Sequence, residues 1–502
     1  MVSRYTSGAR QFNAYNFLII LSVSFGSMSY GYASSAIAPV LALPEFLSYF
    51  SLTTRADGTA LQATFNGLFQ AGGFLGVFLV SYFADKYGRR VAIAVPAVIL
   101  VITAALLAGT TNVGELIVWR FFAGAGTFMI LSAVPIYMTE TVPPLNRGML
   151  VAIHGAALLL GYMVVIWTGY GLFFCKNPTN WRIIFALQAT FPLAVLGMLP
   201  FLPESPRWLI LKGRGEEAKR ILERLHTAEE AQIELEQISN QLEIDKGLPS
   251  DYVSMFRKKS YRKRSLLALG TTMGIQFSGI LVINNYQPTL YATLGYPTER
   301  QLLLEGGWIT LAWGVGVLGC FIVDRMPRPK LIAGALGGCM VCLIIVAALI
   351  ANFVPSDNQT ALQAIIAFLY IYVVFYEGGL DGVQFAYLGE LFPTHLRAKG
   401  MNLGVAGICL MNIIWLQSAP TGIANASWKY FLAYVIPGCL ICIGIWVCFP
   451  DTRGVPLEEV AAMFGDAEEL KSGSAAGTAA AKDVGTEAVE DIDVRSKIKG
   501  EV

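Results

Sequence analysis

Long apolar stretches recur along most of this chain, and they limit its possible folds more than any other feature. A helix needs about 20 apolar residues to cross the hydrocarbon core of a bilayer. The 502-residue chain contains twelve stretches of that kind; 55% of its residues are hydrophobic and only 14% are charged. A water-soluble domain cannot bury so much apolar surface. We therefore predict an all-α polytopic membrane protein with twelve transmembrane helices. The predicted spans are 16–40, 61–82, 91–111, 115–138, 149–172, 183–202, 264–290, 302–323, 331–353, 363–389, 400–423 and 428–449.

A polar segment divides these spans into two groups of six. It is rich in Lys, Arg and Glu, and its amphipathic run from Glu216 to Leu242 is typical of short helices that lie on a membrane surface. After residue 464 the chain turns to Ala, Gly, Ser and mixed charge, so we expect disorder there. The predicted divisions are a cytoplasmic N-terminus (1–15), a first six-helix bundle (16–202), a cytoplasmic loop with interfacial helices (203–263), a second six-helix bundle (264–449) and a cytoplasmic tail (450–502).

The loops predict the orientation of the chain in the membrane. Basic residues gather on one side, and by the positive-inside rule that side is cytoplasmic. The opposite loops contain few cations and hold two N-glycosylation sequons, at Asn358 and Asn425. The first apolar stretch is too long for a signal peptide and lacks a small-residue cleavage site, so we expect it to be retained as a span. The cations on the predicted cytoplasmic side are Lys86, Arg89, Arg90, Arg147, Arg325, Arg328, Lys330, Arg397 and Lys399.

Several functions do not fit the sequence. The formal net charge is only +1, so the chain lacks the strong overall positive charge that would attract nucleic acid. No G-x-x-x-x-G-K-[ST] loop is present to hold ATP, so any driving force must come from gradients. The pairs Cys339/Cys342 and Cys439/Cys442 lie in apolar runs without further metal ligands, and none of the three histidines stands beside a nucleophile. We expect no enzyme, no cofactor, no metal and no obligate protein partner.

Two loops suggest that the halves are repeats. The loop after the second span reads Asp-Lys-Tyr-Gly-Arg-Arg at 85–90, and the loop six spans later reads Asp-Arg-Met-Pro-Arg-Pro-Lys at 324–330. The recurrence of the acid and the trailing cations indicates two repeated halves. Such acids and arginines can form ion pairs between helix ends that close one face of a protein and break when it opens. An ordinary basic cytoplasmic loop is the simpler interpretation of either loop alone.

Further motifs stand at the ends of other spans. They are Arg120 with Gly124 and Gly126, Glu140 with Arg147 and Gly148, Pro-Glu-Ser-Pro-Arg-Trp-Leu at 203–209, Glu-Leu-Phe-Pro at 390–393 with Arg-Ala-Lys-Gly at 397–400, and Pro-Asp-Thr-Arg-Gly at 450–454. In this order and at these boundaries, the chain resembles the sugar porter family of the major facilitator superfamily from residue 31 to 459, in the style of its fungal hexose transporters. The resemblance implies two six-helix bundles around a central site, a lipid bilayer as surroundings and a plasma-membrane location. It also implies a cytoplasmic gate formed by Asp85, Arg89, Arg90, Glu140, Arg147, Glu204, Arg207, Asp324, Arg325, Glu390 and Arg397.

Amides in the seventh span point to the cargo. Helical spacing places Gln276, Asn284 or its neighbour Ile283, and Gln287 along one stripe. Amides and aromatic faces suit a neutral polyol, because they form hydrogen bonds without offering net charge. The alternative is that they join helices by hydrogen bonds. Combined with the family resemblance, these residues give a predicted substrate site of Gln276, Asn284, Tyr286, Gln287, Glu377, Phe385 and Asn412.

The chain also departs from the sugar porter pattern. Ile275 and Leu281 replace a Gln and an Asn, Gly155 stands where a fifth-span Gln is usual, and Phe385 takes the place of a Trp. The motifs that the chain keeps therefore predict a sugar transporter, with a hexose-like sugar as the first expected cargo. The lost ligands leave a polyol, a disaccharide, a quinate-like acid or a secondary metabolite as alternatives. A transporter-like sensor is a further alternative, although such sensors usually carry a longer tail.

The predicted driving force depends on one missing acid. Proton-coupled sugar porters carry a first-span Gly-Tyr-Asp near the fourth-span arginine, whereas this chain has Ala33 at that place, so Arg120 lacks its partner. Uniport is therefore the favoured prediction. However, Glu377 and Asp381 stand four residues apart within the membrane, and two such carboxyls make it easier for one of them to hold a proton. Our hypothesis for proton symport is that Asp381 replaces the missing acid. Alternatively, the pair balances the charge of Arg120.

Overall fold

The computed structural model describes residues 14–141, 147–175, 177–225, 228–246, 248–249, 251–322, 326–354, 358–393, 395–452 and 463–464, and every regular element among them is a helix. The first half contains α1 (Ala14–Ser35), α2 (Ile37–Ala42), α3 (Pro44–Tyr49), α4 (Gly58–Tyr87), α5 (Arg89–Gly109), α6 (Val113–Thr141), α7 (Arg147–Phe173), α8 (Asn180–Leu187), α9 (Thr190–Met198) and the 3₁₀ turn η3 (Leu199–Phe201). The linker contains α10 (Pro206–Leu211), α11 (Gly215–Leu225), α12 (Ala228–Lys246) and α13 (Tyr252–Arg257). The second half contains α14 (Lys259–Ile275), the 3₁₀ turn η4 (Gln276–Ser278), α15 (Ile280–Thr293), α16 (Thr298–Ile322), α17 (Arg328–Phe353), α18 (Gln359–Gly379), α19 (Asp381–Leu391), α20 (Arg397–Ala426) and α21 (Lys429–Cys448).

Twelve helical segments in the described part of the chain are long and apolar enough to cross a membrane. This confirms the predicted all-α fold with twelve spans. Large apolar side chains such as Leu75, Ile344 and Leu440 are exposed on the outside of the bundles, where a water-soluble protein would carry polar ones. They are the surface that faces lipid, since the backbone groups of each span are already bonded within its helix.

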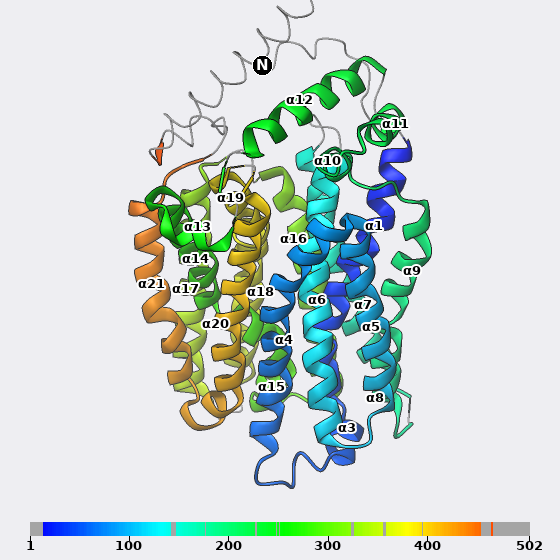
Figure 1. Cartoon of the computed structure of the whole chain (residues 1–502). Helices are drawn as coiled ribbons and strands as arrows, with labels where there is room; N and C mark the ends of the chain where they lie inside the picture. Colours follow the sequence, from blue (N-terminus) through cyan, green and yellow to red (C-terminus); the bar gives the residue numbers. More distant parts are fainter. Residues whose placement is uncertain are drawn as a thin grey trace, which may run out of the picture.

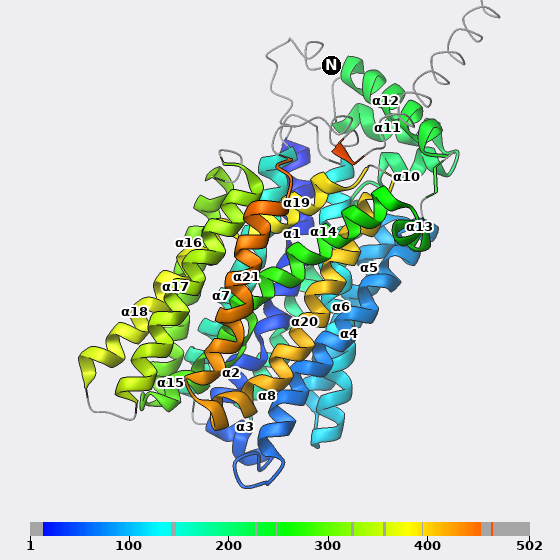
Figure 2. The same ribbon diagram turned by 90° about the vertical axis from the view of Figure 1, so that its left-hand side faces the viewer.

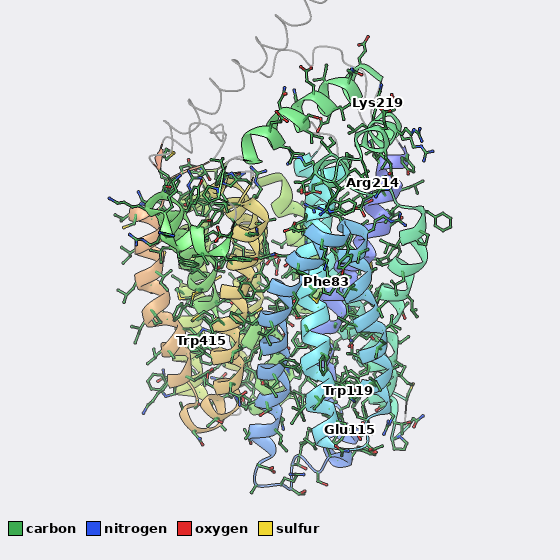
Figure 3. All side chains as sticks on the ribbon, in the orientation of Figure 1. Phe83, Glu115, Trp119, Arg214, Lys219 and Trp415 are labelled. Carbon is green, nitrogen blue, oxygen red and sulfur yellow. The ribbon has the colours of Figure 1, made fainter. Side chains whose placement is uncertain are left out.

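The spans form two bundles side by side, with the linker helices above one end (Figure 1). We call the end that carries α10 to α13 the linker face and the opposite end the far face. Arg214 and Lys219 lie at the linker face, whereas Glu115 lies near the far end of α6 (Figure 3). The first described residues of α1 and the end of α21 both lie toward the linker face, as an even number of spans requires (Figure 2).

Glycines let the helices of the first bundle pack backbone to backbone. A Cβ atom on Gly72 of α4 would lie 1.9 Å from the carbonyl oxygen of Phe121 on α6, and one on Gly124 of α6 would lie 1.9 Å from the carbonyl oxygen of Phe69. The same relation joins α1 and α7, where a Cβ on Gly31 would lie 2.0 Å from the Leu158 oxygen. Helices in lipid associate through such close contacts, because lipid offers no hydrophobic driving force between them.

Two spans of the second bundle are interrupted near mid-membrane. In the seventh span, Gly279 adopts a left-handed conformation with φ of +76° between η4 and α15, and Tyr286 is non-helical with φ of −119°. In the tenth span, Leu380 separates α18 from α19. The regular helical spacing that we assumed for residues 276–287 and for residues 377–381 is therefore broken, because the seventh span turns at Gly279 and Tyr286 and the tenth at Leu380.

The two bundles meet along pairs of long helices. α4 packs on α20 and α7 packs on α16, and α4 and α20 lie next to each other in both ribbon views (Figures 1 and 2). The linker is tied to the first bundle, since the side-chain amide of Asn16 donates to the Leu225 carbonyl at 3.0 Å and the indole of Trp208 donates to the Asp85 carbonyl at 3.2 Å. Transporters built from two repeats bind their substrate at the interface between the repeats, so we expect the transport site between the two bundles.

Candidate functional site

A cavity of about 60 Å³ lies between the bundles. Pockets that hold small molecules usually measure about 300 to 1,000 Å³, so the site is narrow in this conformation. The first bundle contributes apolar side chains and two tyrosines, whereas the amides and carboxyls come from the second bundle. The lining residues are Tyr30, Phe128, Leu131, Leu158, Leu159 and Tyr162 from the first bundle, and Gln276, Ile280, Leu281, Asn284, Trp308, Ile309, Tyr376, Glu377, Asp381, Gln384, Phe385 and Ile408 from the second.

The structure brings together four of the seven predicted substrate residues and leaves three outside the cavity lining. Those in the lining are Gln276, Asn284, Glu377 and Phe385, and Asp381 joins them. Outside it, the Tyr286 hydroxyl accepts from Asn66 of the first bundle at 2.9 Å and donates to the Leu416 carbonyl at 3.2 Å. Gln287 donates to the Tyr291 hydroxyl at 2.7 Å, and Asn412 is buried away from the cavity.

The polar groups of the cavity keep spare hydrogen-bond acceptors. Gln276 donates to the Thr272 carbonyl at 3.3 Å, and Gln384 donates to Asp381 at 3.3 Å. Within the described part of the chain, one carboxylate oxygen of Glu377 and the amide oxygen of Gln384 have no hydrogen-bond partner although they are buried. Buried polar groups normally have partners, so these acceptors can receive hydroxyl donors from a bound solute or from water.

One cavity contact also links the two bundles. Asn284 of α15 accepts a hydrogen bond from the Ser35 hydroxyl of α1 at 3.3 Å. A solute that replaces this hydrogen bond changes the contact between the bundles, which is the coupling that a transporter needs between binding and movement.

Arg120 is buried with few partners. Its side chain is 0% exposed, one guanidinium nitrogen donates to the Ala33 carbonyl at 3.3 Å, and the guanidinium lies 4.3 Å from the centre of the Phe69 ring. Its other two nitrogens have no hydrogen-bond partner among the described residues. Among those residues, Arg120 also forms no ion pair with Glu377 or Asp381. A carbonyl and an aromatic face thus hold this cation, and it is not in the cavity lining.

At the linker face of the first bundle, predicted gate residues form a charge network. Arg89, the first residue of α5, donates two side-chain hydrogen bonds to Glu140 at 2.8 and 2.9 Å and lies 3.7 Å from Asp85. Ser205 also donates to Glu140. Glu204 accepts the backbone N–H of Arg89 at 2.9 Å, so a carboxylate occupies the positive end of α5. This network joins the ends of four spans, the second, third, fourth and sixth.

Close approach at this network requires a glycine. Gly88 has φ of +103°, and a Cβ atom there would lie 2.5 Å from a Glu204 carboxylate oxygen. Burial raises the pKa of the Glu204 carboxyl, while its backbone N–H donors at residues 205, 89 and 90 oppose that rise. Arg207 interacts electrostatically with Glu140 from the start of α10.

The second bundle contains an equivalent network. Arg328, the first residue of α17, donates to Glu390 at 3.0 Å, as Arg89 does to Glu140. Its backbone N–H donates to Asp451 at 3.1 Å, and the Thr452 hydroxyl donates to Glu390 at 2.6 Å. The two halves therefore repeat the same arginine, glutamate, helix-end acid and hydroxyl. These ion pairs join residues within one bundle, while neutral groups cross between the bundles: Asn402 donates to Ser81 at 2.6 Å.

Sequence reasoning omitted Arg328 from the gate, although a signal was present. Arg89 follows Asp85 by four residues, and Arg328 follows Asp324 by four residues. Asp324 and Arg325, which we predicted instead, lie outside the described residues, as does the side chain of Arg147. Arg397 is the first residue of α20, at the same face.

The sequence analysis also did not identify four residues of the cavity lining. They are Gln384, Tyr30, Tyr162 and Trp308, for which the sequence offers no comparable signal.

The two sequons lie at the far face. Asn358 is exposed at the start of α18, where its side chain accepts the backbone N–H of Ala361 at 3.2 Å. Asn425 is exposed in the last turn of α20. An attached glycan is bulky and hydrophilic and must remain in water, and both positions stand at helix ends where water is available.

Known proteins show the same organisation. A family described as sugar (and other) transporter matches residues 19–464. The chain is 28% identical over 447 residues to the MFS-type transporter criB of Aspergillus cristatus, a match that covers 88% of this chain and 91% of that protein. It is 27% identical to the high-affinity glucose transporter of Kluyveromyces lactis, covering 90% of this chain and 86% of that protein. It is 29% identical to the quinate permease of Neurospora africana, covering 88% and 87% respectively.

Solved structures agree in fold. The proton:xylose symporter XylE bound to 6-bromo-6-deoxy-D-glucose matches with a TM-score of 0.77 and 23% identity, over 90% of this chain and 99% of that chain. The inward open conformation of the xylose transporter XylE from E. coli matches with a TM-score of 0.72 and 23% identity, over 89% of this chain and all of that chain. The two bundles repeat one arrangement around a central cavity, and the family match covers most of the chain. This chain therefore belongs to the sugar (and other) transporter family of the major facilitator superfamily, and it is a multi-pass membrane transporter rather than an enzyme.

Proposed function

We propose that this protein carries a neutral, hexose-like sugar across the membrane as a uniporter. The observation that carries the proposal is the chemistry of the central cavity. Two carboxyls, three amides and several aromatic rings meet there, and one oxygen each of Glu377 and Gln384 lacks a described hydrogen-bond partner. No cation occurs among the residues that the structure places in the lining. A sugar offers hydroxyl donors to the acceptors and C–H faces to the rings.

The same chemistry disfavours an acidic cargo. A quinate-like acid would meet Glu377 and Asp381 in a cavity between the bundles, where like charges repel more strongly than in bulk water. The relatives include both a glucose transporter and a quinate permease, so sequence similarity supports either cargo. The carboxyl pair in the lining therefore favours the sugar.

The transport cycle follows from the arrangement of the bundles. Each charge network holds the helix ends of one bundle together, so each bundle can move as one body. The cavity lies at the interface between the bundles, and rocking about it exposes the site to one face and then to the other. We propose that the linker face and both termini are cytoplasmic, because the basic loops gather there, and that the membrane is the plasma membrane.

Uniport rests on the surroundings of Arg120. With Ala33 beside it, Arg120 forms no ion pair with a carboxyl among the residues that the structure describes, so no acid is paired with it there for proton exchange. Proton symport through Asp381 is the second candidate, favoured by one observation: this acid lies in the cavity lining together with Glu377. In that case cargo binding and proton binding share one cavity.

The experiment is uptake into vesicles that contain the purified protein. Labelled hexoses, polyols, disaccharides and quinate are tested with and without an imposed proton gradient, in the parent and in Asp381→Asn. Equal uptake of a sugar with and without the gradient in both proteins supports uniport. Accumulation that needs the gradient and is lost in Asp381→Asn establishes symport instead. Uptake of quinate but of no neutral solute would overturn the sugar proposal.

A paired substitution tests the cavity itself. Gln276→Ala removes one hydrogen-bonding group from the lining, and we expect KM for the sugar to rise about tenfold, as the loss of roughly 1.4 kcal/mol predicts. Gln301→Ala is the matched control, because this buried amide donates to the Tyr296 carbonyl outside the cavity. An equal change in KM for both variants would contradict the proposed site.

A further inference from the structure

Glu305 is a buried acid outside the central cavity. It lies on α16, is 1% exposed, and neither of its carboxylate oxygens has a hydrogen-bond partner within the described part of the chain. Glu305 also takes part in none of the ion pairs among the described residues. An isolated charge at this depth is costly, and an acid avoids that cost by carrying a proton.

Glu305 lies one helical turn from the cavity, toward the far face. Trp308 and Ile309, which line the cavity, are three and four residues further along α16 and so share a helix face with Glu305. Across from it, Gln287 of α15 is three residues beyond the lining residue Asn284. A second polar layer therefore lies beyond the cavity on the path to the far face.

This second layer consists of Gln287, Tyr291 and Glu305. Gln287 donates to the Tyr291 hydroxyl at 2.7 Å, and its own amide oxygen has no described partner. Tyr291 interacts electrostatically with Glu305. Three buried acceptor atoms, two on Glu305 and one on Gln287, thus lack donors, whereas such atoms are normally bonded. A proton on Glu305 removes its charge and converts one acceptor into a donor.

The groups that face Glu305 contain no described cation. Besides Tyr291, the tyrosines nearby are Tyr296 after α15 and Tyr370 of α18, whose hydroxyl donates to the Leu304 carbonyl at 2.6 Å. α7 meets α16 through neutral groups, since Trp167 donates to the Thr310 hydroxyl at 3.0 Å. Of the acids on the helices that pack against α16, Glu377 and Asp381 belong to the cavity lining, and Glu390 of α19 is paired with Arg328 at the linker face. α2 contributes no titratable side chain.

We propose that Glu305 is a proton-binding site that controls opening of the far side. The carboxyl holds a proton while α15 covers it; when the outer part of α15 moves away and water enters, the O–H bond breaks and the proton passes to water at the far face. The conformational breaks at Gly279 and Tyr286 give α15 the freedom for this movement. The inference rests on the alternating-access part of the proposed function, and it requires no net proton transport. A low pH at the far face then keeps Glu305 protonated and favours the state in which the far side is closed.

Infrared spectroscopy tests the proton directly. A protonated carboxylic acid has a carbonyl-stretch band that is absent from a carboxylate. We expect the purified protein at neutral pH to show this band and Glu305→Gln to lose part of it, whereas Glu299→Gln, an exposed acid two turns earlier on the same helix, leaves it unchanged. Identical spectra for the parent and Glu305→Gln would overturn the proposal. This measurement needs no cargo, so it stands apart from the failure of any sugar to be transported.

Thiol labelling tests the link to opening. A cysteine is placed at the buried Leu290 of α15 in a Cys175→Ser background, because Cys175 is exposed. The rate of labelling from the far side by an impermeant reagent is then followed against pH. The thiolate is the reactive form, so labelling rises with pH in every variant. One linked proton predicts an additional rise of up to roughly tenfold per pH unit in the parent and in Glu299→Gln, relative to Glu305→Gln. Equal pH dependence in all three proteins, or none in any, would refute the proposed control.

Discussion

The glycine contact between α4 and α6 allows a sharp prediction about stability. In Gly72→Ala the new Cβ atom would lie 1.9 Å from the Phe121 carbonyl oxygen and 2.8 Å from its carbonyl carbon. Real Cβ contacts essentially never fall below 3.0 Å, so the two helices must separate by more than 1 Å at this crossing. A gap of that size forfeits up to about half of the dispersion energy of each affected atom pair. Overpacking of this kind costs about 1 to 3 kcal/mol.

The same substitution elsewhere supplies the control. Gly334 lies within α17 on an exposed surface, and a Cβ atom there meets nothing within 4 Å. Its replacement by alanine gains helix propensity, up to about 1 kcal/mol. We expect the free energy of unfolding in detergent, measured by denaturant titration, to fall by about 2 kcal/mol in Gly72→Ala relative to Gly334→Ala. A difference below about 0.5 kcal/mol would refute the assignment of this contact as tight backbone packing.

Three further predictions concern charge and modification. Glu140→Gln removes the hydrogen-bonded charge partner of the half-buried Arg89, leaving only the more distant Asp85, and should lower the free energy of unfolding by about 3 kcal/mol; Glu390→Gln should cost less, because the Glu390 side chain is 29% exposed against 12% for Glu140, and equal losses would contradict this reasoning. Ala33→Asp places an acid beside the arginine of the fourth span, so uptake in vesicles should gain a dependence on the proton gradient; unchanged uptake would argue against that pairing. Asn358→Gln should increase mobility in gel electrophoresis if the far face is external, and an unaltered band after expression in a glycosylating host would count against modification there.

The number and order of the spans could be predicted because each one must satisfy the bilayer by itself. Length and hydropathy are local properties, and they gave twelve spans that the structure contains. The interruption of the seventh span could not be predicted in the same way. Gly279 is visible in the sequence, but its left-handed conformation depends on how η4 and α15 pack against Tyr434, close to the glycine.

The cavity lining was accessible to sequence reasoning only in part. Gln276 and Asn284 stand out because amides are rare in an apolar span, and Glu377 and Asp381 stand out because acids are rarer still. Tyr30 and Tyr162 cannot be distinguished from other buried tyrosines in the sequence, since their place in the lining depends on how α1 and α7 are rotated against the second bundle. The places of Tyr286 and Gln287 depend on the same packing, because beyond the turn at Tyr286 both bond to neighbours outside the cavity lining.

The placement of the first charge network also bears on how the protein is made. Its last members, Glu204, Ser205 and Arg207, follow closely after the sixth span, and all its other members precede them in the chain. Synthesis runs from the N-terminus, and domains of large proteins generally fold as units in that order. The first bundle therefore possesses all the partners of this network while the second is still being translated. A nascent chain arrested beyond the linker should already protect the first six spans from protease, whereas the matching network of the second bundle must wait for Asp451 and Thr452.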